Sequence, residues 1–97
     1  MPTYITLYKW TENGMKTIKE APARIAAAVK RTETAGGKLL GVYVTMGEYD
    51  LVAVYEARSD EDAAAGLFTQ GMLGTVRSTT LKAFTAEQFA EIVKKLP

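Results

Sequence analysis

The sequence YVTMGEYDLVAV, residues 43–54, has the pattern of two β-strands joined by a short turn. β-Branched and aromatic residues, which favour strands, occupy both ends of this segment. Gly47-Glu48 stands between them, and a type II′ hairpin turn favours glycine at its first central position. We therefore predict an antiparallel hairpin whose strands cover residues 38–46 and 50–57.

The sequence on either side of this hairpin predicts two more strands and three helices. The first strand alternates polar and apolar residues, the first helix opens with a proline, and the last begins with the Thr-x-x-Gln pattern of a capping box. The strands cover residues 4–10 and 75–84, and the helices cover 22–35, 59 to 71 or 74, and 85 to about 96. The order βαββαβ plus a terminal helix predicts an α+β, ferredoxin-like fold with an antiparallel sheet, in a single domain over residues 1–97.

The helices of this fold cover one face of the sheet and leave the other open. A two-residue turn sets Thr45 opposite Asp50, and side chains then alternate between the two faces. The aliphatic set belongs beneath the helices and comprises Val42, Val44, Met46, Tyr49, Leu51 and Ala53. The mixed set belongs on the open face and comprises Tyr43, Thr45, Asp50, Val52, Val54 and Glu56.

The open face is too apolar for a solvated sheet surface in a stable monomer. Tyr8 and Trp10 join it if the first strand has the matching parity. We expect a second copy of the chain to cover this face, which gives a symmetric homodimer able to assemble further through its sheet edges. Alternatively, the last helix folds over the face, or its aromatic edges stay in contact with water.

The composition excludes several classes of chemistry. The chain has no Cys and no His, so it forms no disulfide, Cys-based zinc or iron–sulfur site, Ser-His-Asp triad or His-ligated haem. We expect no cofactor and no metal, the one alternative being an oxygen-only site at Asp50 and Glu56. The 12 Lys and Arg and 11 Asp and Glu give a net charge of +1. The basic residues are spread along the chain, so we expect no nucleic-acid partner.

The sequence contains no pattern of a targeting signal or a membrane span. Residues 1–10 alternate between polar and apolar and lack the apolar core of a signal peptide. No run approaches the roughly 20 apolar residues that cross a bilayer. We therefore expect a soluble, cytoplasmic protein with no membrane partner.

Asp50 is the candidate catalytic residue. On the inner face of a dimer, its carboxylate could be buried, have a raised pKa and act as a general base. An aspartate beside a turn also commonly hydrogen-bonds main-chain amides, which is a structural role. Both interpretations stay open.

Aromatic and basic residues are the candidates for ligand binding. Aromatic rings stack on planar ligands, phenol hydroxyls orient them, and guanidinium groups bind anions. The candidates are Tyr8, Trp10, Tyr43, Tyr49, Arg24 and Arg77. The alternatives are that the rings fill the core of a dimer and that each arginine forms only a surface salt bridge.

The ordered motifs of the chain resemble the GYD domain family, which is named for Gly-x-Tyr-Asp, here Gly47, Tyr49 and Asp50. The flanking features that also fit lie at residues 11–14, 21–24, 36–37, 74–80 and 84–85, so the resemblance covers nearly the whole chain. It implies a dimeric α/β barrel, in which two ferredoxin-like subunits place their open sheet faces together. The family supplies no accepted activity and no catalytic residues.

Two functions fit these observations. The first is a homodimer that binds a small, aromatic molecule in a sheet-lined pocket of Tyr8, Tyr43, Asp50 and Arg77. Such a protein could act as a cofactor-independent isomerase or monooxygenase-like enzyme, although the fold alone does not choose an activity. The alternative is a non-catalytic ligand-sensing or protein-interaction module with a solidly packed inner face.

Overall fold

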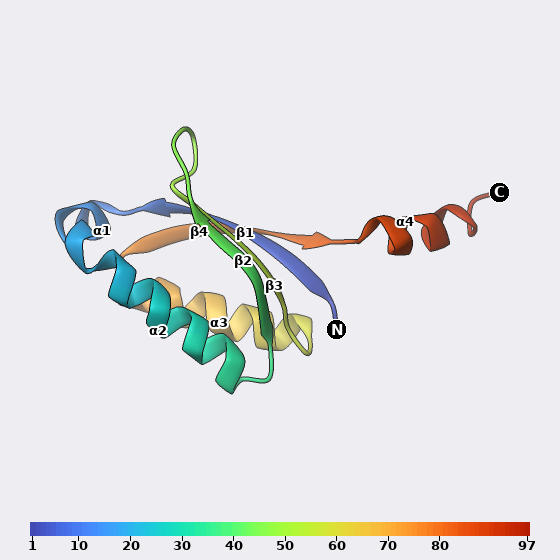
Figure 1. The fold of residues 1–97 in the computed structure, drawn as a ribbon, viewed down its shortest axis with the longest axis horizontal. Coiled ribbons are helices and arrows are strands. Elements are labelled where there is room, and N and C mark those ends of the chain that lie inside the picture. Colours follow the sequence, from blue (N-terminus) through green and yellow to red (C-terminus); the bar gives the residue numbers. More distant parts are fainter.

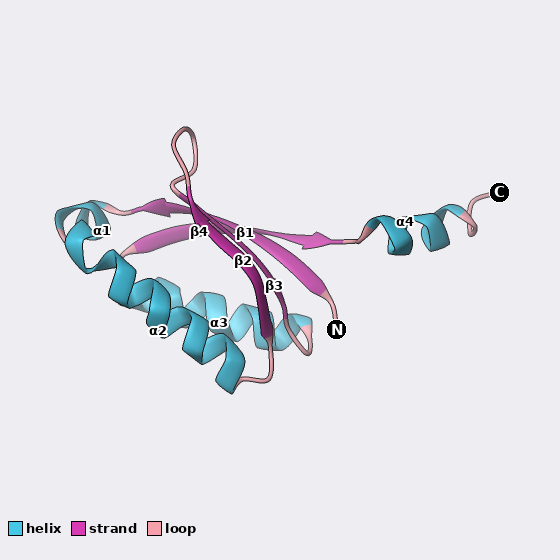
Figure 2. Cartoon of the chain, viewed as in Figure 1, coloured by secondary structure: helices cyan, strands magenta, loops and turns pink.

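The computed structural model describes all 97 residues. Four strands form one antiparallel sheet in the order β2-β3-β1-β4, and helices α2 and α3 lie on the same face of it (Figures 1 and 2). The strands are β1 (Thr3–Trp10), β2 (Lys38–Val44), β3 (Leu51–Glu56) and β4 (Val76–Ala83). The helices are α1 (Glu12–Lys16), the 3-10 helix η1 (Ile18–Glu20), α2 (Ala21–Thr34), α3 (Asp60–Leu73) and α4 (Ala86–Val93). The predicted α+β, ferredoxin-like order is confirmed.

The ends of the longer helices follow from local sequence signals. Pro22 lies in the first turn of α2, where a missing N–H costs no helical hydrogen bond. The Ser59 hydroxyl caps α3 by accepting a main-chain N–H of its first turn, and Gly74 ends α3 with a φ of 77°. The predicted capping box forms at the start of α4, where Thr85 and Gln88 each accept the other's main-chain N–H.

The hairpin has the predicted register but a longer loop. β2 ends at Val44 and β3 begins at Leu51, its cross-strand partner. The Thr45 N–H donates to the Asp50 carbonyl oxygen at 2.9 Å, which keeps the expected pairing of these two residues. Residues 46–49 form the loop in place of the two-residue turn, and Gly47 has a φ of 124°, a conformation that favours glycine.

The parity of β1 places Tyr8 beneath the helices. Tyr8 pairs with Leu51, and residues paired across a sheet share a face. Tyr8 is therefore only 5% exposed, whereas Tyr43 lies on the opposite face and is 64% exposed. The expectation that Tyr8 joins Tyr43 on the open face is wrong.

A hydrogen-bonded cluster accounts for this parity. Thr6 is fully buried, and its Oγ1 lies 2.9 Å from the Tyr55 hydroxyl and 2.9 Å from Thr80 Oγ1. On the same face of β1, the Tyr4 hydroxyl donates a hydrogen bond to Asp60 at the start of α3, and the Tyr4 ring stacks on Tyr55. Buried polar groups need such partners, and the side chains of β3, β4 and α3 on this face supply them.

The other face of the sheet is uncovered. α4 continues from the end of β4 away from the body of the fold and does not return over the sheet (Figure 1). Phe89 on α4 and Leu96 beyond it remain exposed. The alternative in which the last helix covers the open face therefore does not occur within this chain.

Gly14 in α1 is expected to tolerate no side chain. A Cβ on Gly14 would lie 2.1 Å from the main-chain oxygen of Thr75, an atom that cannot move without shifting the start of β4. Gly14→Ala should therefore lower the free energy of unfolding by about 3 kcal/mol, as severe overpacking does. Urea unfolding measures this loss.

Gly66 in α3 supplies the matched control for that experiment. A Cβ on Gly66 would meet nothing within 4 Å. Gly66→Ala should raise the free energy of unfolding by about 0.5–1 kcal/mol, because alanine favours an interior helical position over glycine. Equal effects of the two substitutions would contradict the close packing of α1 on β4.

Candidate functional site

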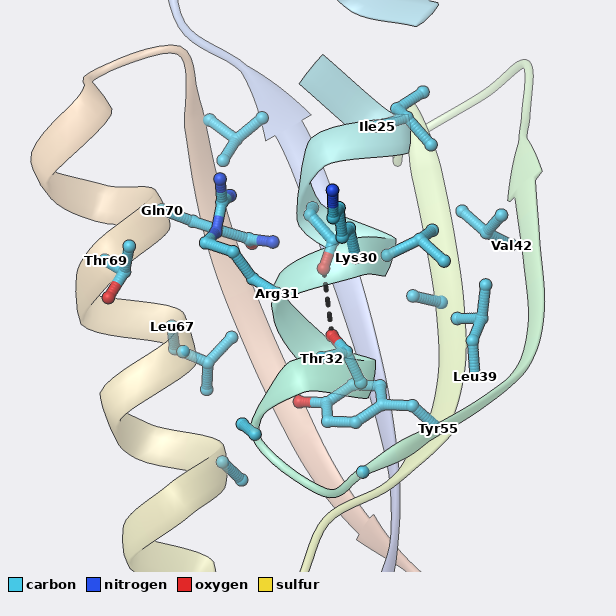
Figure 3. A pocket seen from close by; sticks show the side chains of 18 of the residues that line it. Ile25, Lys30, Arg31, Thr32, Leu39, Val42, Tyr55, Leu67, Thr69 and Gln70 are labelled. Atoms are coloured by element: carbon cyan, nitrogen blue, oxygen red, sulfur yellow. Dashed lines mark hydrogen bonds between the residues drawn. The ribbon is translucent and has the colours of Figure 1, made fainter. Parts of the chain in front are cut away.

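A cavity of about 640 Å³ lies between the sheet and the inner sides of α2 and α3 (Figure 3). Of its 30 lining residues, 18 are hydrophobic, so the walls are mainly apolar. Tyr8 and Trp10 line it from β1, and Tyr55 lines it from β3. The space therefore lies on the helix side of the sheet, not on the open face where the sequence predicted a pocket.

Small residues on both helices leave this space unfilled. Ala28 of α2 and Ala65 and Gly66 of α3 line the cavity. Such short side chains cannot reach across to the sheet, whereas larger ones would interdigitate and close the gap. The alanine-rich sequences of α2 and α3 are therefore the direct cause of the cavity.

The cavity also contains buried polar groups. Burial raises the pKa of the Tyr8 hydroxyl to about 12, and the nearby Tyr55 adds to this rise. The Tyr8 hydroxyl is therefore neutral at physiological pH and can donate a hydrogen bond. A hydrogen bond from the side chain of Gln70 in α3 opposes this rise, whereas the Oε1 of Gln70 is buried and accepts no hydrogen bond. A buried acceptor without a donor is uncommon in proteins.

Basic side chains of α2 and of the loop before α3 stand at the edge of the cavity. Arg58 forms an ion pair with Asp62 at 3.1 Å. Arg31 also lines the cavity, is exposed, and forms none of the ion pairs of the chain. In Figure 3 its side chain extends from α2 into the gap toward α3.

The structure brings together only three of the predicted site residues. Tyr8, Trp10 and Arg24 line the cavity. The residues outside it are Tyr43, Tyr49, Asp50 and Arg77. The single pocket of Tyr8, Tyr43, Asp50 and Arg77 is thus not assembled within one chain, because β1 turns its tyrosines toward the helices.

Asp50 makes main-chain contacts at the end of the central strands. Its Oδ2 accepts the N–H of Trp10 at 2.9 Å, and its own N–H donates to the carbonyl oxygen of Tyr8 at 2.8 Å. Both bonds join the start of β3 to the end of β1. This geometry is that of the structural role considered for Asp50 from the sequence.

The two predicted anion-binding arginines have different surroundings. Arg24 donates to Thr17 Oγ1 at 3.1 Å and to the Thr17 carbonyl oxygen at 3.2 Å, so it fastens α2 to the end of α1. Arg77 is exposed and pairs with Lys9 across β1 and β4. The Lys9 ammonium lies 5.3 Å from the centroid of the Tyr49 ring, a cation–π contact near the hairpin loop.

The open face carries an apolar centre. Side chains of β1, β3 and β4 point to this face; the apolar ones are Ile5, Leu7, Val52, Val54 and Leu81. They lie within one sheet surface that neither α2, α3 nor α4 covers (Figure 1). The prediction from the hairpin pattern that Val52 and Val54 lie on the open face is confirmed, whereas Ile5 and Leu7 take the place expected for Tyr8 and Trp10.

α3 is apolar on both sides. Leu67 and Gln70 face the cavity, whereas Phe68 and Met72, four residues apart on one helical stripe, do not line it. Phe68 is 74% exposed and Met72 is 85% exposed. Neither the cavity nor this outer stripe was predicted from the sequence, although the run Ala-Ala-Ala-Gly-Leu-Phe at residues 63–68 signals both.

No group of three or more His, Cys, Asp or Glu residues is arranged to hold a metal ion. None of the helices has the length and apolar character that a bilayer crossing requires.

The element order, sheet topology and uncovered face define a ferredoxin-like α+β protein. The GYD domain family matches residues 4–93, and this chain belongs to that family. A Thermus thermophilus protein named "Glutamine synthetase and cystathionine beta-lyase binding protein" is 30% identical over 97 residues, which are 99% of each chain. The crystal structure of TTHA0845 from Thermus thermophilus is similar with a TM-score of 0.53 and 28% identity, over 89% of this chain and 96% of that one.

Replacing Asp50 should affect stability through its bond to Trp10. Asp50→Ala leaves the Trp10 N–H without its acceptor and should lower the free energy of unfolding by about 1–3 kcal/mol. Asp50→Asn keeps an acceptor oxygen and should lose less. Urea titration followed by the fluorescence of Trp10, the one tryptophan of the chain, measures both variants. Equal stability of Asp50→Ala and the unmodified protein would show that this bond is not structural.

Proposed function

We propose that this protein is a non-catalytic interaction module that forms a homodimer and binds another protein. Two uncovered apolar surfaces on different sides of the fold carry this proposal, namely the open sheet face and the outer stripe of α3. The name of the Thermus thermophilus relative, which describes binding to two enzymes, supports an interaction role. The catalytic alternative depends on Asp50, whose carboxylate already accepts a main-chain N–H.

The open sheet face is proposed as the homodimer interface. Its apolar residues belong to the two central strands and β4, so they form a continuous surface that a matching sheet can bury. A two-fold axis brings the same patch of both copies together. α4 supports this assignment, because it extends past the end of β4 with Phe89 exposed and can reach a second copy (Figure 1).

The outer stripe of α3 is proposed as the surface that binds the other protein. An apolar helix stripe is ordinarily buried, but only the sheet and α2 cover α3, and they leave Phe68 and Met72 exposed. Phe68 and Met72 supply an aromatic anchor and a flexible side chain that adapts to a partner's shape. By analogy with the relative, we propose glutamine synthetase or cystathionine β-lyase as the partner to test first.

A charge on the open face should separate the dimer. Val54→Lys places an ammonium group in the centre of the proposed interface and should weaken dimerisation at least about tenfold, since an unpaired charge is costly to bury. Sedimentation equilibrium over a range of concentrations measures the change. Ala26→Lys, at an exposed position of α2, is the matched control and should leave the dimer unchanged. A monomer for the unmodified protein would contradict the proposed interface.

Loss of the outer stripe should weaken partner binding. Phe68→Ser and Met72→Ser should each reduce affinity for purified glutamine synthetase or cystathionine β-lyase of the same organism at least about tenfold, as truncation of an interface anchor does. Biolayer interferometry gives the dissociation constants. Ala26→Ser serves as the control with an unchanged constant. If both serine variants bind as tightly as the unmodified protein, α3 is not the partner surface.

A further inference from the structure

We infer that the cavity beneath α2 and α3 is a binding site for a small aromatic carboxylate that carries an N–H donor on its ring system. This site is separate from the two surfaces of the proposed function. Its inference therefore does not depend on dimerisation or on partner binding.

The size and walls of the cavity fit an aromatic molecule. A volume of about 640 Å³ falls among ligand pockets, which range from roughly 300 to 1,000 Å³. Tyr8, Trp10 and Tyr55 supply ring surfaces, and Leu67 of α3 lies across from them in the same cavity. Such walls favour a planar apolar ligand, because rings stack in offset or edge-to-face arrangements.

Gln70 specifies a hydrogen-bond donor on that ligand. Its Oε1 is buried at the cavity and has no donor from the protein. Leaving a buried acceptor unsatisfied is costly, so a ligand N–H that reaches it gains the full benefit of the bond. The Tyr8 hydroxyl is protonated at neutral pH, because burial raises the pKa of Tyr8 to about 12. The neutral hydroxyl does not repel an anionic ligand, and the side chains of Gln70 and Thr6 lie within hydrogen-bonding range of it.

The guanidinium of Arg31 favours a ligand that carries a negative charge. Arg31 lines the same cavity from α2 and has no acidic partner in the chain. Figure 3 shows Arg31 from α2 and Gln70 from α3 projecting into the gap between the two helices. A guanidinium binds a carboxylate through two parallel hydrogen bonds. A ligand whose ring N–H meets Gln70 can therefore present its carboxylate to Arg31 at the edge of the cavity.

Two probe molecules test these assignments. Indole-3-acetate has a flat ring system, an N–H and a carboxylate, and 1-naphthylacetate has a similar shape and charge but no N–H. We expect isothermal titration calorimetry to show that both bind the unmodified protein, and that indole-3-acetate binds about tenfold more tightly. Failure of both to bind at about 5 mM, or equal affinities, would overturn the inference.

Three variants assign the binding to this cavity. Gln70→Leu should remove the preference for indole-3-acetate, and Arg31→Gln should weaken both probes about tenfold. Gly66→Leu fills open space at the cavity wall and should abolish binding of both. A preference that survives Gln70→Leu, or binding that survives Gly66→Leu, would place the ligand elsewhere and refute the site.

Phe68→Ser is the matched control on the opposite side of α3, and it should leave both probe affinities unchanged. A weakened probe affinity in Phe68→Ser would show that the probes bind the outer stripe instead. Near-ultraviolet circular dichroism verifies that each variant is folded. Because the partner assay depends on Phe68 and the probe assay on Gln70, failure of one proposal is distinguishable from failure of the other.

Discussion

The buried hydroxyl of Thr6 constrains the whole arrangement. Thr6 is the one fully buried residue of the chain, and its hydroxyl joins β1 to Tyr55 of β3 and Thr80 of β4. A one-residue shift of β1 would expose this cluster and leave its hydroxyls without partners beneath the helices. Since side chains alternate along a strand, fixing Thr6 also fixes Tyr4 and Tyr8 on the helix side.

The placement of Thr6, Tyr4 and Tyr8 on the helix side gives the two faces of the sheet different properties. The helix side holds tyrosines, threonines and a cavity, because small residues on α2 and α3 stop short of the sheet. The open side holds Ile5, Leu7, Val52 and Val54, which have no polar atoms in their side chains. A mainly apolar cavity with a few polar groups suits a small ligand, whereas the aliphatic centre of the open face suits association with another sheet.

The sequence predicted the features that depend on neighbouring residues and missed those that depend on distant parts of the chain. The register at Thr45 and Asp50 and the caps at Ser59 and Thr85 depend on neighbouring residues, and they are confirmed. The parity of β1 depends on β3, β4 and α3, which the alternation of β1 cannot reveal, because both of its faces are rich in apolar groups. The unpaired Oε1 of Gln70 could not be predicted either, since the sequence does not indicate whether a polar residue on a helix finds a partner.

The position of α3 links the two proposed binding events. One turn of this helix presents Leu67 and Gln70 to the cavity and Phe68 to the outside. Under the two proposals, one face of the same helix contacts the ligand and the opposite face contacts the partner. If occupancy of one site changed the affinity of the other, the change would be reciprocal. The open sheet face lies on the other side of β1 and β3 from this helix, so the proposed dimer interface overlaps neither of the two α3 surfaces.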